Sequence, residues 1–234
     1  MTDHTVKAFD DDLNRLRGLV SEMGSRATMA VEQAMLALDR RDRDSAARII
    51  ADDRVIDELE NEIEKLVVTT IALRAPMADD LRSMIAALKI AAVLERVGDY
   101  AKSIAKRVPL LSTDRAIEAI PLLMSMSEIA CEMLRDVLAA YAARDPVLAE
   151  DVTARDKSVD DFYNAIFRNL ITYMMESPRS ISEAAHLLFV AKNLERAGDH
   201  ATNVAEMVYF TATGRHMDER EKGENPADPL PDAA

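Results

Sequence analysis

Paired carboxylates are the residues of this sequence with the clearest potential for chemistry. Among its 234 residues, four pairs of acids separated by four positions stand at matching places in the two halves of the chain. The four pairs are Asp53 with Asp57, Glu95 with Asp99, Asp156 with Asp160, and Glu195 with Asp199. On a helix, a spacing of four brings both carboxylates of a pair to one face. Carboxylates that converge repel one another, so such groups require a metal ion, protons or basic partners.

The pairs belong to two copies of a repeated sequence. Residues 94–101 read LERVGDYA and residues 194–201 read LERAGDHA, at an offset of 100 and with two differences in eight. Residues 53–59 and 156–162 align at an offset of 103. A period this long lies outside the range of solenoid repeats and indicates a duplicated domain. Each copy therefore carries one set of four acids, two on each of two segments.

The composition favours helices as the elements that position these acids. Aromatic residues make up 4% of the chain, tryptophan is absent and six residues are glycine, whereas β-sandwiches and barrels need more of these residues. Apolar residues recur every three or four positions, as in Ile49, Ile56, Leu59 and Ile63, which is typical of a buried helical face. We expect six helices, over residues 4–40, 44–74, 78–107, 114–142, 146–175 and 179–211.

The duplication and the helices together predict an all-α fold of two tandem three-helix bundles, with six long antiparallel helices. The first bundle is expected to span residues 1–110 and the second residues 111–213. Asp145, which precedes a proline, is expected to cap the fifth helix. Residues 214–234 are rich in acids and proline and have little to bury, so we expect a disordered acidic tail.

Counting along the chain predicts that each set of acids converges. Asp57 lies 19 residues before Pro76 and Glu95 lies 19 residues after it, while Asp53 and Asp99 are both 23 residues from that proline. Residues at equal distances from the turn of an antiparallel helical hairpin lie at one level. Four carboxylates should therefore meet across the second and third helices. The acids of the second copy are likewise symmetric about the turn between Ser177 and Pro178.

Two interpretations of the converging acids stay open. The basic residues that adjoin them are Arg54, Arg96, Arg155, Lys157 and Arg196. These residues could form salt bridges with the acids on a solvated face. Adjacent residues on a helix point about 100° apart, however, which favours a metal ion over these neighbours. Carboxylate oxygens are hard ligands, so they suit Fe, Mn, Mg or Ca better than a structural zinc.

Composition and motifs argue against several functions. The chain has 42 acidic and 29 basic residues and a net charge of −13, which disfavours nucleic acid and anionic membranes as partners. It starts without a signal-peptide pattern, and no apolar run reaches the roughly 18 residues of a membrane span. The single cysteine, Cys131, excludes an internal disulfide and is expected to be buried. We therefore expect a cytoplasmic protein.

The sequence offers no catalytic residues. A phosphate-binding glycine loop and a nucleophile with a matched base are both missing, so we expect no enzymatic activity. A carboxylate-bridged metal protein with a storage or redox role stays an alternative, although the ferritin-like plan needs two Glu-x-x-His motifs. The sequence has one, from Glu183 to His186, and it lies about two turns away from the acids. A helical scaffold whose acids pair only with arginines is a third possibility.

The repeated segments resemble the PhoU family, the phosphate-uptake regulators of bacteria. The family motif Glu/Asp-x-x-x-Asp is matched by Glu95 with Asp99 and by Glu195 with Asp199. The resemblance covers about residues 4–211. It implies a cytoplasmic six-helix protein, often a homodimer, that binds metal ions at these acids. It also implies a link between the ATPase subunit of a phosphate ABC transporter and a sensor histidine kinase, with negative regulation of the phosphate-starvation response when phosphate is plentiful.

The two copies differ just beyond the motif. Asn203 and Glu206 match the usual family ending, and the resemblance makes Asn203 a further candidate ligand. Their counterparts in the first copy are Ser103 and Lys106. Because an ammonium group opposes cation binding, we expect the second site to bind metal more tightly than the first.

Overall fold

The chain folds into helices joined by short turns. The computed structural model describes residues 2–111 and 119–217, and within these ranges it contains no strand. The helices are α1 (Thr2–Arg40), α2 (Arg43–Arg74), α3 (Ala78–Ala105), α4 (Ala119–Ala143), α5 (Pro146–Ala154), α6 (Asp156–Glu176) and α7 (Ile181–Thr213). Single 3₁₀ turns follow α3 at Val108–Leu110 and precede α7 at Pro178–Ser180.

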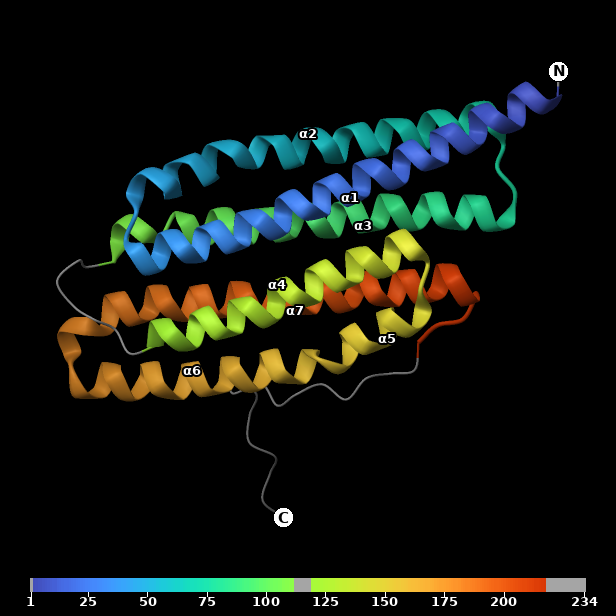
Figure 1. The fold of residues 1–234 in the computed structure, drawn as a ribbon. Helices are drawn as coiled ribbons and strands as arrows, with labels where there is room; N and C mark the ends of the chain where they lie inside the picture. The colour runs from blue at the N-terminus through green and yellow to red at the C-terminus, as the bar shows by residue number, and fades with distance from the viewer. Residues whose placement is uncertain (1, 112–118, 218–234) are drawn as a thin grey trace, which may run out of the picture.

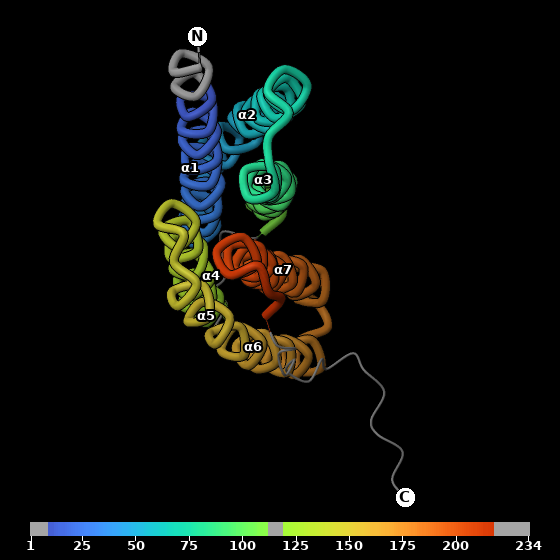
Figure 2. Tube along the Cα trace, turned by 90° about the vertical axis from the view of Figure 1, so that its right-hand side faces the viewer, coloured from blue at the N-terminus to red at the C-terminus, as the bar shows by residue number. Residues whose placement is uncertain are grey.

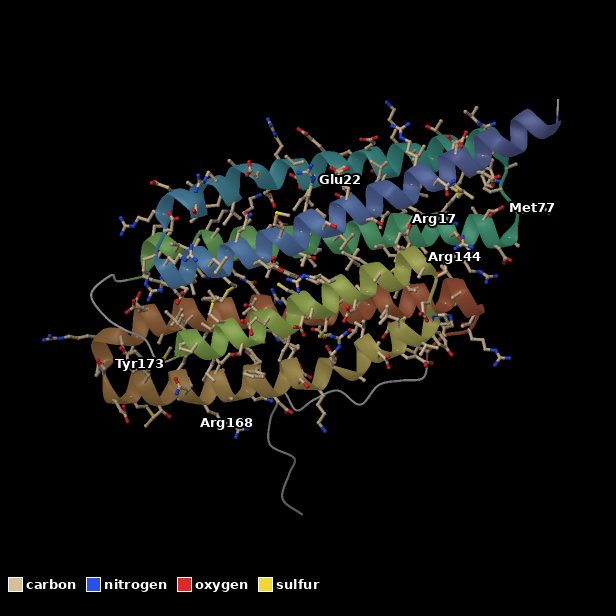
Figure 3. All side chains as sticks on the ribbon, viewed as in Figure 1. Arg17, Glu22, Met77, Arg144, Arg168 and Tyr173 are labelled. Atoms are coloured by element: carbon tan, nitrogen blue, oxygen red, sulfur yellow. The ribbon has the colours of Figure 1, made fainter. Side chains whose placement is uncertain are left out.

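The helices form two three-helix bundles, as the sequence predicts. In Figure 1, α1, α2 and α3 form one layer, and α4, α7 and the bent rod of α5 and α6 form the other. The layers meet where α3 packs against α7 and α1 packs against α4, which the end-on view of Figure 2 displays. Met77, between α2 and α3, and Tyr173, near the end of α6, lie at opposite ends of the molecule (Figure 3). The two hairpins that carry the acids therefore point in opposite directions.

The backbone repeats at the start of each hairpin. Arg41 and Arg144, which are equivalent in the two repeats, both adopt a left-handed conformation, with φ of 55° and 53°. The next residue then caps a helix. Asp42 Oδ1 accepts hydrogen bonds from two backbone N–H groups of α2, and Asp145 Oδ1 accepts from those of Val147 and Leu148 at 2.9 and 3.2 Å. The predicted cap at Asp145 is confirmed.

One predicted helix is broken in the structure. The sequence predicts a single helix over residues 146–175, but α5 ends at Ala154 and α6 begins at Asp156. The N–H of Arg155 bonds to the carbonyl of Val152 at 3.1 Å, a tighter 3₁₀-type bond. Its guanidinium donates to Asp136 Oδ2 of α4 at 2.5 Å, which ties the break to the neighbouring helix. As a result, Asp156 becomes the first residue of a helix.

Each hairpin buries its apolar face in a core that continues through both bundles. Leu94 and Val97 of α3 and Leu194 and Ala197 of α7 are fully buried near the contact between the layers. Cys131 of α4 is also buried in this core, as expected. Within the described ranges, no helix combines the length and apolar character that crossing a bilayer would require.

Parts of the sequence predictions lie outside the described residues. These are the first residues of the predicted fourth helix, up to residue 118, and the acidic tail beyond residue 217. At the end of α7, Gly214 adopts a left-handed conformation with φ of 74° and closes the helix. The His216 ring then stacks on Phe210, with the ring centroids 4.7 Å apart.

Candidate functional site

The acids of the first repeat lie near a close approach of α2 and α3. Gly98 permits this approach, because a Cβ there would be 2.8 Å from Ile56 Cδ1 and 3.5 Å from Asp53 Oδ1. Asp53 is consequently buried, with 6% of its surface exposed. Gly98 thus marks a close contact between the two helices. A buried carboxylate at this point needs a partner that offsets the cost of losing its hydration.

Lys102 is the partner of Asp53 in this structure. Its Nζ donates to Asp53 Oδ2 at 2.5 Å and lies 3.8 Å from Asp99 Oδ1, so one ammonium connects α2 with α3. The hydrogen bond to Asp53 raises the pKa of Lys102 above its ordinary value. The sequence did not single out this residue, because only the basic residues adjacent to the acids were considered as their salt-bridge partners. The available signal was the spacing of three between Asp99 and Lys102, which places both on one helical face.

The other acids of the first repeat remain under mutual repulsion. Burial, and then the charge of Asp53, raises the pKa of Asp57. Burial also raises the pKa of Glu95, and the charges of Asp99 and Glu60 add to the rise. Glu60 is therefore a further acid of this cluster that the sequence analysis did not include.

The second repeat positions its acids in a related way. Gly198 faces Val159 of α6, whose Cγ1 would be 3.2 Å from an added Cβ. Asp156, at the start of α6, is 7% exposed. Lys192 Nζ donates to Glu195 Oε1 at 2.7 Å and also lies 5.1 Å from the centre of the Tyr163 ring. Lys192 is three residues from Glu195, as Lys102 is from Asp99, and it too was not predicted from the sequence.

The carboxylate of Glu195 has hydrogen-bond partners for only one of its two oxygens. Its Oε2 is buried and has no hydrogen-bond partner. Burial raises the pKa of Glu195, and the hydrogen bond from Lys192 opposes that rise. A buried oxygen without a partner is unfavourable, and a cation with an affinity for oxygen would relieve this cost. The all-oxygen donor set of the second repeat therefore fits a hard metal ion.

Asn203, the ninth candidate ligand, lies at the contact between the two layers. Its Nδ2 is 3.4 Å from His200 Nδ1, and His200 Nε2 is 2.8 Å from the Tyr100 hydroxyl of α3. The Tyr100 and His200 rings stack with their centroids 5.5 Å apart. These two residues, which are equivalent in the repeats, thus contact each other directly. Burial lowers the pKa of His200, which favours the neutral ring.

Two further observations bear on the choice between metal and salt bridges. Arg54 pairs with Glu58 at 3.3 Å and Arg155 with Asp136, while Arg96 Nε reaches Glu95 Oε2 only at 3.9 Å. In the part of the chain that the structure describes, no three His, Cys, Asp or Glu side chains are arranged together as metal ligands. Asp57 is electrostatically coupled to Asp53 and Asp99, and Glu195 is coupled to Asp160 and Asp199. A metal ion would require the side chains of such acids to close around it.

The fold and the repeated hairpins with their acids define a protein of two tandem PhoU domains. The PhoU domain matches the sequence twice, over residues 20–108 and 123–208. The chain belongs to the PhoU family, as the resemblance of its motifs indicates.

Similar proteins extend over almost the whole chain. The phosphate-specific transport system accessory protein PhoU homolog of Zymomonas mobilis is 54% identical, covering 95% of this chain and 94% of that protein. The protein of the same description from Caulobacter vibrioides is 47% identical, covering 93% and 95%. The crystal structure of the phosphate transport system regulatory protein PhoU from Streptococcus pneumoniae superposes with a TM-score of 0.84 at 29% identity, over 90% of this chain and all of that one. PhoU from Pseudomonas aeruginosa gives a TM-score of 0.76 at 31% identity, over 92% of this chain and all of that one.

Proposed function

We propose that this protein is an accessory protein of a phosphate-specific transport system and regulates phosphate uptake. The observation that carries the proposal is the 54% identity, over 95% of the chain, to a protein described as such an accessory protein. The tandem bundle architecture, which it has in common with solved PhoU structures, also supports it. The protein acts in the cytoplasm by binding other proteins rather than by catalysis.

We further propose that its partners are the ATPase subunit of the phosphate transporter and a sensor histidine kinase. Through them it represses the phosphate-starvation response when phosphate is plentiful, and it acts as a homodimer. This proposal is tested by biolayer interferometry of the purified protein against the ATPase subunit and the cytoplasmic part of the kinase. We expect saturable binding to both, with an unrelated ATPase subunit as the control. Absence of binding to either would contradict the linking role.

We also propose that carboxylates of the second repeat bind a metal ion of the Fe, Mn, Mg or Ca type. The ligands would come from Asp156, Asp160, Glu195, Asp199 and Asn203. The unpartnered buried Oε2 of Glu195 supports this site. A bound cation would supply positive charge among these acids. Adding Mn²⁺ should therefore raise the melting temperature of the protein, and Asp199→Ala should abolish the rise. Oxygen-dependent turnover or many ions per chain would instead favour a storage or redox protein.

A further inference from the structure

We propose that Lys102 is the resident cation of the first repeat, so that this repeat needs no metal ion and only the second repeat binds one. The inference rests on the proposed metal binding and assigns it to one of the two acid sets. Of the four candidate ligands of the first repeat, Asp53, Asp57, Glu95 and Asp99, Asp53 and Asp99 then form a structural contact bridged by this lysine.

The position of the ammonium group is the first argument. Lys102 Nζ lies between the helices, 2.5 Å from Asp53 Oδ2 on α2 and 3.8 Å from Asp99 Oδ1 on α3. Asp53 and Asp99 lie at equal distances from Pro76, so the ammonium occupies the place of a metal ion that would bridge this pair. A metal ion at this point would either repel the ammonium or displace it from a buried carboxylate. A metal ion bridged by Asp53 and Asp99 therefore does not fit the first repeat while Lys102 is present.

The corresponding position of the second repeat carries no charge. Residue 202 is threonine, and its hydroxyl is fully buried and donates to the Asp199 carbonyl oxygen at 2.7 Å. The hydroxyl is therefore directed at the backbone of its own helix. The difference between Lys102 and Thr202 lies at equivalent positions three residues beyond Asp99 and Asp199.

The second repeat has its own lysine, but this residue makes a different contact. Lys192 binds Glu195 of the same helix and lies over the Tyr163 ring, and its counterpart in the first repeat is Ala92. It satisfies only one oxygen of Glu195, since Oε2 has no hydrogen-bond partner. Lys192 therefore forms an ion pair within its own helix, whereas Lys102 joins the two acid-bearing helices.

Lys102 is also a better candidate than Lys106 for the predicted weakness of the first site. Lys106 is exposed at the end of α3 and forms none of the ion pairs found in the described part of the chain. It therefore provides a matched control: a lysine on the same chain segment, four residues from Lys102, that does not contact the acids.

The experiment counts Mn²⁺ ions per chain by equilibrium dialysis and elemental analysis, for the full-length protein and its variants. We expect the wild-type protein to bind Mn²⁺ in the second repeat only, so that Asp199→Ala loses it and Asp99→Ala retains it. Lys102→Thr, which gives the first repeat the residue of the second, should bind one additional equivalent. Adding Asp99→Ala to this variant should remove the extra ion, and Lys106→Thr should behave as the wild type.

Thermal unfolding in EDTA provides a second readout. Lys102→Thr should melt at a lower temperature than the wild type, because Asp53 loses its partner. Adding Mn²⁺ should raise the melting temperature of this variant back toward that of the wild type. Loss of Mn²⁺ from the wild-type background in Asp99→Ala, or no gain in a folded Lys102→Thr, would overturn the inference. The Asp99→Ala test does not require the Lys102 variant to fold. Neither result depends on transcriptional repression, which tests the proposed regulatory function separately.

Discussion

At the scale of single residues, the closest ion pairs of the candidate acids are made by lysines that lie three positions from an acid on the same helix, Lys102 from Asp99 and Lys192 from Glu195. Lys102 binds Asp53 from beside Asp99, and Lys192 binds Glu195. The helical period explains this, because residues three apart share a face and adjacent residues do not. A long aliphatic stem also lets an ammonium reach a buried carboxylate while part of the side chain stays exposed.

Cys131 gives a prediction that depends on pH. Burial raises the pKa of its thiol from 9.0 to about 12. Because the folded pKa is above the unfolded one, the stabilising effect of the protonated thiol is fully present below pH 9 and is lost as the pH rises toward 12. The free energy of unfolding of the wild type should therefore fall relative to Cys131→Ala above pH 9, by up to about 1.4 kcal/mol per pH unit.

Urea unfolding of both proteins at about pH 7 and about pH 10 measures this difference in the free energy of unfolding, which the linkage relation predicts only at the higher pH. A thiol reagent offers an independent check, since only the unfolded chain should react at about pH 8. A constant difference between the two proteins, together with rapid labelling of the folded chain, would show that Cys131 is accessible.

At the scale of the elements, local patterns predicted the helices better than their interruptions. The cap at Asp145 and the helical hairpins followed from the spacing of apolar residues, aspartates and prolines. The break at Arg155 did not, because it depends on a contact with Asp136 in another helix, which periodicity does not report. The same limit applied to the site: the spacing of the acids placed them on facing helices, but it did not indicate that a lysine side chain would reach across from α3 to α2.

Two glycines of α1 should respond to alanine in opposite ways. Gly18 is exposed and a Cβ there would meet nothing within 4 Å, so Gly18→Ala should stabilise the protein by up to about 1 kcal/mol through helix propensity. A Cβ at Gly24 would overlap the side chain of Leu138 on α4. Gly24→Ala should therefore destabilise the contact between the bundles by about 1–3 kcal/mol.

The two substitutions act as controls for each other, since both remove a glycine from one helix. Urea unfolding at neutral pH gives both free energies of unfolding. Equal effects of the same sign would mean that α1 does not pack against α4 at Gly24 as described.

At the scale of the whole molecule, the two repeats form one continuous structure. Polar contacts across α3 and α7 join them, because Asn193 donates to the Ser103 hydroxyl at 3.1 Å in addition to the contact of Tyr100 with His200. The Arg107 guanidinium lies 4.9 Å from the centre of the Phe189 ring, and Arg82 lies 5.5 Å from that of Phe210. Each pair joins α3 or its end to α7.

A structure in which the two bundles are joined in this way is compatible with the proposed binding of partner proteins. Asp53 and Asp156 are buried within their hairpins, whereas partner proteins would bind the exposed faces of the bundles. Removing the protein should consequently affect signalling and transport together, while changes to one acid set should alter metal content and stability first.

The most direct test of the regulatory role deletes the gene and measures a phosphate-responsive promoter reporter during growth in high phosphate. The account predicts that the deletion strain expresses the reporter strongly despite the phosphate, and that the wild-type gene supplied in trans restores repression. Reporter expression that stays as low in the deletion strain as in its parent would contradict the proposal that this protein represses the phosphate-starvation response.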